Sequence, residues 1–286
     1  MRATVARRAH QRSVPVDSSA SRSDLPARLA TAAVGIPTLL VVIELGGTVY
    51  VAVAAVLLAL GAYELVRAAG IGRRDPLAWC TVLGAGAIAG AAALGRDTIP
   101  LVVAGLIALT LLVEVLRADV NRGFARWSTA VGATLYPGVL GSHIVLLRQA
   151  TDGRDWVLLM LFTTFATDTG AYALGRLVGG PKLAPRISPG KTIAGAVGGL
   201  LSGALAAGAL GVVLGLDRPL ALWLALGAVV AVAGQAGDLA ESLLKRSLGV
   251  KDLGRLFPGH GGAMDRLDSV LFTAPVVYWV VQWISG

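Results

Sequence analysis

The amino-acid sequence predicts an all-α protein, a polytopic membrane bundle of about nine transmembrane helices with its N-terminus in the cytoplasm. Of the 286 residues, 55% are hydrophobic and only 15% are charged, and the mean hydropathy is +0.72. A soluble domain carries about a quarter of its residues as charged side chains. The apolar residues also gather in windows of about 20 residues, the helix length that crosses a hydrocarbon core.

These windows lie between charged residues and turns that contain Gly or Pro. They cover residues 29–45, 48–66, 77–94, 98–116, 127–147, 156–175, 192–216, 220–248 and 267–285. The first two windows meet at Gly46-Gly47, a turn so short that the sequence leaves open whether they are separate helices.

The chain divides into three parts by composition. Residues 1–28 are rich in Arg, Ser and Ala and predict a disordered, basic cytoplasmic tail, although a targeting segment has a similar composition. Residues 29–160 are expected to form the N-terminal transmembrane helices. Residues 161–286 are expected to form a C-terminal transmembrane region, which contains the candidate catalytic residues described below.

Basic residues test the number of spans independently, because cytoplasmic loops of membrane proteins carry most Lys and Arg. With nine spans, 21 of the 25 Lys and Arg residues fall in the N-terminal tail and in alternate loops. The sequence therefore predicts a cell (inner) membrane protein whose basic side faces the cytoplasm.

The net charge of +8 is thus explained by membrane orientation, and it disfavours nucleic-acid binding because it is not gathered on a soluble domain. The single cysteine, Cys80, allows no internal disulfide. One cysteine and three separated histidines exclude a structural zinc site.

The first five predicted spans contain few groups that suggest chemistry. Glu44, Glu64 and Glu114 lie near span ends and are interpreted as solvated or helix-packing acids. In the later spans, the run of small residues at 195–199 permits close helix packing, within a subunit or between the two copies of a homodimer.

The sixth window places a carboxylate deep in the membrane. Thr164, Asp168 and Tyr172 recur at intervals of four and share one helix face. Intramembrane acids usually face a bundle interior or a water-filled cavity. Asp168 is therefore a candidate functional residue, with a buried structural ion pair as the alternative.

The loop after this span is rich in small residues and contains Ser188-Pro-Gly-Lys191-Thr192. Thr192 is expected to open the next helix. Backbone N–H groups at a helix N-terminus favour anions, so Ser188, Lys191 and Thr192 are candidate phosphate-binding residues.

The eighth window carries a polar stripe on an otherwise apolar helix. Its members share one face: Gln235, Asp238, Glu241, Ser242, Lys245 and Arg246. Internal ion pairs are the structural alternative.

The segment after the eighth window contains further charged and Gly-rich motifs. These are Lys251-Asp252, a Gly-rich segment with His260, Gly261 and Gly262, and the acids Asp265 and Asp268 on either side of Arg266 and Leu267. Acids beside basic residues at a cavity mouth suit a metal-bound polyphosphate.

These motifs resemble the signature of the phosphatidate cytidylyltransferases. The resemblance is carried by Ser242–Arg246, Lys251-Asp252, Pro258–Gly262 and Asp265–Asp268, with Asp168–Tyr172, Ser188–Thr192 and Gly237–Ser242 upstream in the same order. It covers about residues 163–270. The chain departs from the family pattern at Ala263, where a larger aliphatic residue is usual, and at Ala194, where many members carry Glu.

The resemblance implies a reaction in which CTP and phosphatidic acid give CDP-diacylglycerol and pyrophosphate, with Mg²⁺ required and a second cation such as K⁺ as an open question. It also implies a polar cavity open to the cytoplasm and to lipid. In that cavity, acids matching Asp238 and Asp265 hold a two-cation centre, and Glu241 and Asp268 are expected as further or alternate ligands.

The remaining roles are hypotheses built on that reaction. Lys245, Arg246, Lys251 and Arg266 would hold the triphosphate and the leaving pyrophosphate, while Ser188 and Lys191 with loop N–H groups, including those near Thr192, Gly261 and Gly262, would bind a phosphate. Ser242 is expected to contact substrate. His260 would donate a hydrogen bond to phosphate or order its loop, and Asp168 would ligate metal or orient a lysine.

Two other functions stay open at this stage. One is an enzyme of related chemistry, either a CTP-dependent lipid kinase or a cytidylyltransferase for an isoprenoid or ether lipid phosphate. The other is an ion-coupled transporter that uses the buried acids as an ion pathway, but this does not explain a Gly-rich loop and basic cluster on one side only.

Overall fold

The computed structural model describes residues 25–254, 256 and 261–285. The predicted tail lies outside this part of the chain except for its last positions, which begin the first helix at Leu25 rather than at residue 29. His260 also lies outside the described residues.

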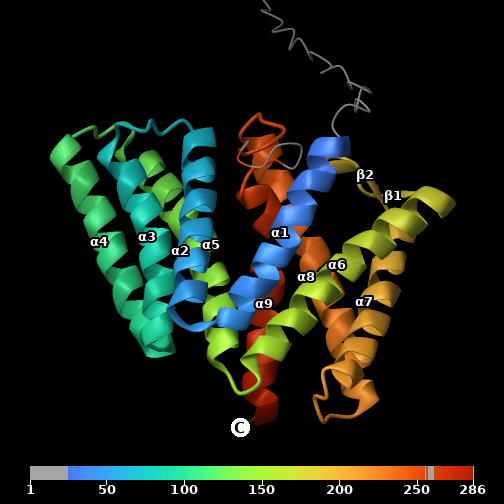
Figure 1. The fold of residues 1–286 in the computed structure, drawn as a ribbon. Helices are drawn as coiled ribbons and strands as arrows, with labels where there is room; N and C mark the ends of the chain where they lie inside the picture. The colour runs from blue at the N-terminus through green and yellow to red at the C-terminus, as the bar shows by residue number, and fades with distance from the viewer. Residues whose placement is uncertain (1–24, 255, 257–260, 286) are drawn as a thin grey trace, which may run out of the picture.

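The described chain is almost entirely helical, which confirms the predicted fold class (Figure 1). The helices are α1 (Leu25–Leu45), α2 (Gly47–Ala68), α3 (Pro76–Leu94), α4 (Ile99–Arg117), α5 (Gly123–Gln149), α6 (Gly153–Val178), α7 (Ile193–Val213), α8 (Leu220–Ser247) and α9 (Met264–Ser285). By length and composition, α2 to α9 can each cross a membrane, whereas the apolar part counted in α1 is the shorter stretch Ala33–Leu45.

The question left open at the first turn is answered by the structure, because α1 and α2 are separate helices. Gly46 and Gly47 have φ angles of 59° and 50°. A side chain is strained in this left-handed region, and a Cβ at Gly46 would also collide with the guanidinium of Arg148. The chain can therefore reverse here within two residues.

One part of the prediction was incomplete, because the segment between α6 and α7 is not only a loop. It forms an antiparallel hairpin of β1 (Lys182–Ala184) and β2 (Ser188–Thr192), in which Lys182 pairs with Thr192 and Ala184 with Ser188. Thr192 then caps α7, since its hydroxyl accepts the N–H of Gly195 at 3.0 Å. The expected role of Thr192 as the start of the next helix is confirmed.

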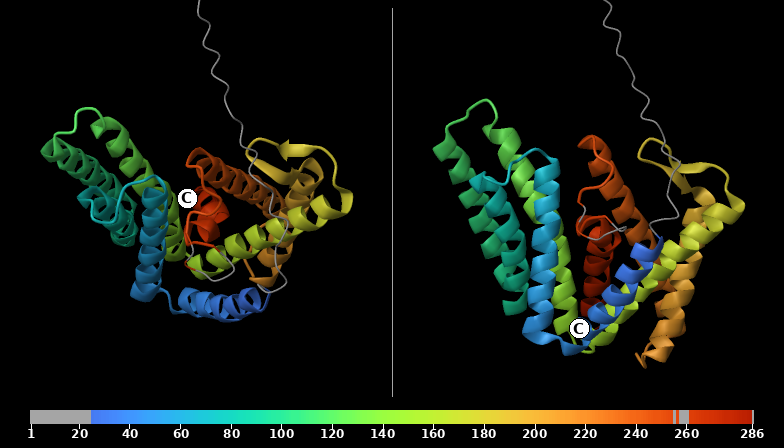
Figure 2. Two further views of the ribbon diagram at one scale, coloured as in Figure 1. Left: turned by 90° about the horizontal axis from the view of Figure 1, so that it is seen from above. Right: turned by 45° about the horizontal axis from the view of Figure 1, so that its top comes forward.

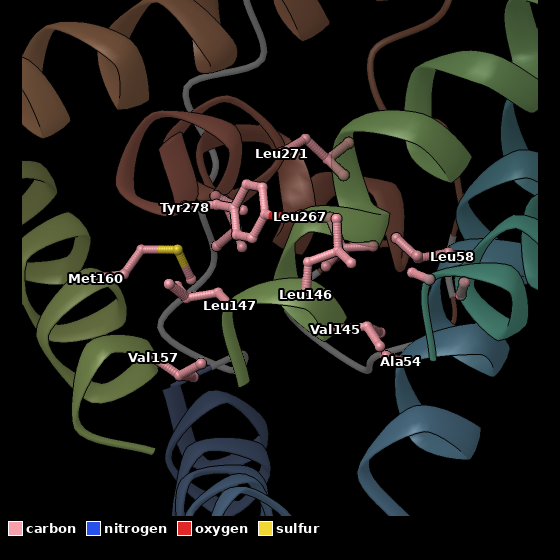
Figure 3. Packing of buried hydrophobic residues seen from close by; sticks show 14 of the residues in the cluster. Ala54, Leu58, Val145, Leu146, Leu147, Val157, Met160, Leu267, Leu271 and Tyr278 are labelled. Atoms are coloured by element: carbon pink, nitrogen blue, oxygen red, sulfur yellow. The ribbon is translucent and has the colours of Figure 1, made fainter. Parts of the chain in front are cut away.

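The helices fall into two groups that meet along α9. Helices α2 to α5 lie on one side, α6 to α8 on the other, and α9 packs against both α5 and α8; α1 crosses obliquely between the groups (Figures 1 and 2). The core lies where α2, α5, α6 and α9 converge, and Figure 3 shows Leu58, Leu147, Met160 and Leu271 among the buried side chains there.

Because successive helices run in opposite directions along the bundle, the basic loops lie together at one end. The loops after α2, α4, α6 and α8 all lie at the same end of the bundle, the upper end in Figure 1, and the hairpin and the start of α9 share that end. This end is called the basic end below. Its location in the cytoplasm stays a prediction.

Candidate active site

The hairpin brings a lysine to the polar stripe of α8. Lys191 Nζ lies 2.6 Å from Asp238 Oδ2, an ion pair whose geometry is not that of a hydrogen bond. Ser242 lies one turn further along α8, and its hydroxyl is 3.5 Å from Asp238 Oδ1. Three of the predicted site residues, from two segments of the chain, therefore meet at one point.

A second ion-pair cluster lies one turn closer to the end of α8. The ammonium of Lys245 donates to Glu241 Oε2 at 2.9 Å and to Asp265 Oδ1 at 2.8 Å. The other oxygen of Asp265 accepts the N–H of Gly262 at 2.8 Å. Glu241 is only 1% exposed, and its Oε1 has no hydrogen-bond partner among the described residues. A buried carboxylate oxygen without a donor is costly, so this one is available to a ligand.

The remaining acids join the two clusters into one site. Asp168 of α6 lies close enough to Asp238 and Asp268 for their charges to interact, and Lys191 and Arg266 are near the same carboxylate. Asp268 in turn interacts with Asp238. The acids and cations predicted from three separate motifs therefore form a single charged site at the basic end, between α6, α8, α9 and the hairpin.

Small residues make this convergence possible. A Cβ at Gly237 would collide with the backbone carbonyl of Asp268, so α8 and α9 can cross this closely only with glycine there. Between α6 and α7, Gly198 of α7 packs against Leu174 and the carbonyl of Gly170, both of α6. The predicted small-residue run of α7 thus packs against α6 within the subunit.

Other predicted residues lie at the edge of the site. Arg246, Lys251 and Arg266 are exposed and form no ion pair with any described residue. Gly261 has a φ angle of 85°, which a side chain would strain, and it is followed by the buried Gly262. Ser188 begins β2 and is half-buried. The exposed cations are free to meet a polyanion that enters from solvent.

Two residues of the N-terminal helices reach the site although sequence reasoning did not place them there. The hydroxyl of Tyr136 on α5 is buried, has no partner among the described residues, and lies near Glu241 and Asp268. Glu64 on α2 is 7% exposed and accepts two backbone N–H groups at the start of α9. Glu64 was interpreted as a solvated or helix-packing acid; it is buried and contacts the start of α9, and no sequence pattern indicated that partner.

The donor set fits Mg²⁺ in its chemistry. Mg²⁺ is usually bound by one or two carboxylates and completed by substrate phosphates and water. Among the described residues, no three His, Cys, Asp or Glu side chains converge to hold a metal on their own. Neighbouring acids with an unpartnered buried oxygen therefore suit a cation that arrives with a polyphosphate.

Residues 26–284 match the sequence model of the Cytidylyltransferase family. The chain belongs to the cytidylyltransferase family.

Individual relatives support this membership over a shorter stretch. The chain is 42% identical over 144 residues to the phosphatidate cytidylyltransferase of Staphylococcus saprophyticus, which is 50% of this chain and 54% of that protein. It is 44% identical over 129 residues to the protein of the same name from Staphylococcus haemolyticus, covering 44% of this chain and 49% of that protein. The chain thus spans about half the length of the curated relatives it matches. The predicted family is confirmed.

Proposed function

We propose that this cytidylyltransferase-family protein transfers the cytidylyl group of CTP to phosphatidic acid, which yields CDP-diacylglycerol and pyrophosphate. The single observation that carries the proposal is the charged site itself. Lys191–Asp238 and Lys245–Asp265 lie within one polar cluster at the basic end of an otherwise apolar bundle. The printed names of the aligned relatives supply the nucleotide and the lipid.

In the proposed reaction, a phosphate oxygen of phosphatidic acid attacks the α-phosphorus of CTP. The bond from that phosphorus to the bridging oxygen breaks, and pyrophosphate leaves with its electron pair. A phosphate monoester has a second pKa of about 6, so the nucleophile is already anionic near neutral pH and needs no strong base. The main barrier to the reaction is the electrostatic repulsion between two polyanions, and correctly positioned cations lower this barrier.

In this proposal, the basic residues of the site bind phosphates and the acids bind the metal. Lys191 and Lys245, now paired with acids, and the exposed Arg246, Lys251 and Arg266 are suited to bind the phosphates. Asp238 and Asp265, with Glu241 and Asp268 beside them, would hold Mg²⁺, and the same acids would take any second cation such as K⁺. Mg²⁺ would neutralise phosphate charge and favour departure of pyrophosphate.

The location of the site supports a cytoplasmic reaction at a cell membrane. The site lies at the basic end, where the hairpin and the loop after α8 meet. Positive loops are typical of the cytoplasmic side, and CTP is a cytoplasmic substrate. A lipid substrate can reach the same level by lateral diffusion along the exposed apolar faces of the helices.

Labelled CTP tests the function and separates it from its nearest rival. Purified protein in detergent receives phosphatidic acid and CTP labelled at either the α- or the γ-phosphorus. We expect only the α label to enter the lipid, with one pyrophosphate released for each lipid formed. Transfer of the γ label with release of CDP would instead show a lipid kinase, and no label in the lipid would contradict both enzymes.

A further inference from the structure

Glu64 joins the N-terminal helices to the segment that carries Asp265. Its Oε1 accepts the N–H of Ala263 at 3.0 Å, and its Oε2 accepts the N–H of Met264 at 2.9 Å. These groups begin α9, where backbone N–H groups have no intrahelical partner and the helix dipole favours a negative charge. Glu64 therefore supplies the cap of a helix that lies about 200 residues further along the chain.

The N–H group just before these two, that of Gly262, is bound by Asp265, one of the proposed metal-binding acids. Gly262 donates to Oδ2 of Asp265, and the other oxygen of Asp265 accepts from Lys245. Three successive N–H groups are thus held by two carboxylates, and the rotation of this turn sets where Asp265 points. Any movement of the turn that releases Glu64 would move Asp265 relative to Lys245.

The surrounding chain is shaped around the Glu64 side chain. A Cβ at Gly254 or at Gly262 would collide with its carboxylate. One turn earlier on α2, Gly61 leaves space for the fully buried Met264. Gly254 and Gly262 therefore both lie against the Glu64 carboxylate, which a side chain with only a local capping role would not require.

We infer that Glu64 is a positioning residue for the proposed cytidylyl transfer. It holds the Gly261–Asp265 turn in the orientation that directs Asp265 toward Lys245, and it touches neither substrate nor reacting atoms. The inference rests on the proposed function for its catalytic consequence. Its structural consequence, an ordered turn at the start of α9, is independent of the reaction.

The first test compares Glu64→Gln with Glu114→Gln in the full-length protein in detergent. Glutamine keeps the size of Glu64 but leaves one oxygen to accept hydrogen bonds. Glu114 is a matched control because it is equally buried on another N-terminal helix and accepts from Arg126 rather than from the turn. We expect Glu64→Gln to lower kcat about 10- to 100-fold, while the KM for CTP changes by less than about threefold.

Amide hydrogen exchange supplies a readout that does not need activity. Peptides covering residues 261–268 should exchange faster in Glu64→Gln than in the wild type, with α3 and α4 unchanged, and Glu114→Gln should leave the turn protected. A turn that stays protected in Glu64→Gln with unchanged kcat would overturn the inference. Faster exchange spread evenly over all helices would also overturn it, because Glu64 would then support only global stability.

A double-mutant cycle guards against a variant that simply misfolds. Gly254→Ala should disturb the turn, because its methyl group meets the Glu64 carboxylate. Glu64→Ala vacates that space, so the double variant should be no worse than Glu64→Ala in exchange of the turn. Independent, additive effects would contradict the contact.

Failure of the wild type to transfer the α label would reject the proposed function, but it would leave these exchange results to decide the role of Glu64 in ordering the turn.

Discussion

The ammonium of Lys245 lies 2.8 Å from Asp265 Oδ1 and 2.9 Å from Glu241 Oε2, so it joins the end of α8 to the start of α9. The three side chains are 17%, 6% and 1% exposed. With the cation removed, two largely buried acids would face each other unpaired.

Substitution of Lys245 should therefore affect both stability and activity. We expect Lys245→Met to destabilise the protein by about 3–5 kcal/mol, as for other broken buried ion pairs, and to abolish measurable CDP-diacylglycerol formation. Lys245→Arg should retain much of the stability because it keeps the charge. Thermal unfolding in detergent and the α-label assay measure the two effects; an active, equally stable Lys245→Met would contradict the described pairing.

The crossing of α8 and α9 at Gly237 should not tolerate a side chain. Gly237→Ala places a methyl group against the carbonyl of Asp268, so we expect a lower Tm and at least a roughly tenfold loss of activity. Gly90→Ala on α3 is the control, because nothing lies within 4 Å of the added methyl. That change should be neutral or stabilise by about 0.4–1 kcal/mol; equal effects of the two substitutions would reject close packing as the cause.

The N-terminal helices have an ion-pair cluster of their own, with a defined pH dependence. Asp75 caps α3 and accepts from Arg117 at 2.8 Å and from Arg126. Burial alone would raise the pKa of Asp75, but its hydrogen bond to Arg126 and the charges of Arg126 and Arg117 outweigh burial and lower this pKa. A lowered folded-state pKa contributes stability that is present above the unfolded value, about 3.9, and is lost as pH falls through the folded value.

Asp75→Asn should therefore lower the Tm at pH 7, by the equivalent of about 1–3 kcal/mol for charged hydrogen bonds. The difference from the wild type should shrink as pH falls below about 4. Unfolding of both proteins across that range checks the sign. A difference that grows toward acid pH would mean that the Asp75 carboxylate is not stabilised by these arginines.

The membrane orientation can be tested by labelling, since Cys80 is the only cysteine. In a Cys80→Ser background, Arg186→Cys lies in the hairpin at the basic end, and Asp217→Cys lies in the turn between α7 and α8 at the opposite end; both positions are exposed. An impermeant maleimide should label Arg186→Cys only when it can reach the cytoplasmic side and Asp217→Cys only from the other side. The reverse pattern would place the site away from cellular CTP.

The sequence was sufficient to predict the helical class and most span boundaries, because membrane helices leave long apolar windows. It also singled out the acids of α8 and of the start of α9 as candidates, since charges in or beside such windows are costly and usually face a bundle interior. The eighth window, 220–248, corresponds to α8, a continuous helix of 28 residues across Gly234 and Gly237.

The parts that sequence reasoning missed depend on contacts between distant segments. The ion pairs of Lys191 with Asp238 and of Lys245 with Asp265 require the packing of the hairpin, α8 and α9. Glu64 and Tyr136 gave no local signal, because one acid and one tyrosine near apolar windows are common and their partners lie far away in the sequence. The hairpin was also missed, since its short strands have no alternating pattern.

In the proposed function, Asp238 and Asp265 are the acids around which cytidylyl transfer takes place. The most direct measurement is the rate of CDP-diacylglycerol formation by purified, folded Asp238→Asn and Asp265→Asn at saturating Mg²⁺. We expect each variant to lose essentially all turnover, because loss of a required ligand costs several kcal/mol of transition-state stabilisation. Retention of more than about a tenth of the wild-type rate in both variants, a cost below about 1.4 kcal/mol, would contradict it.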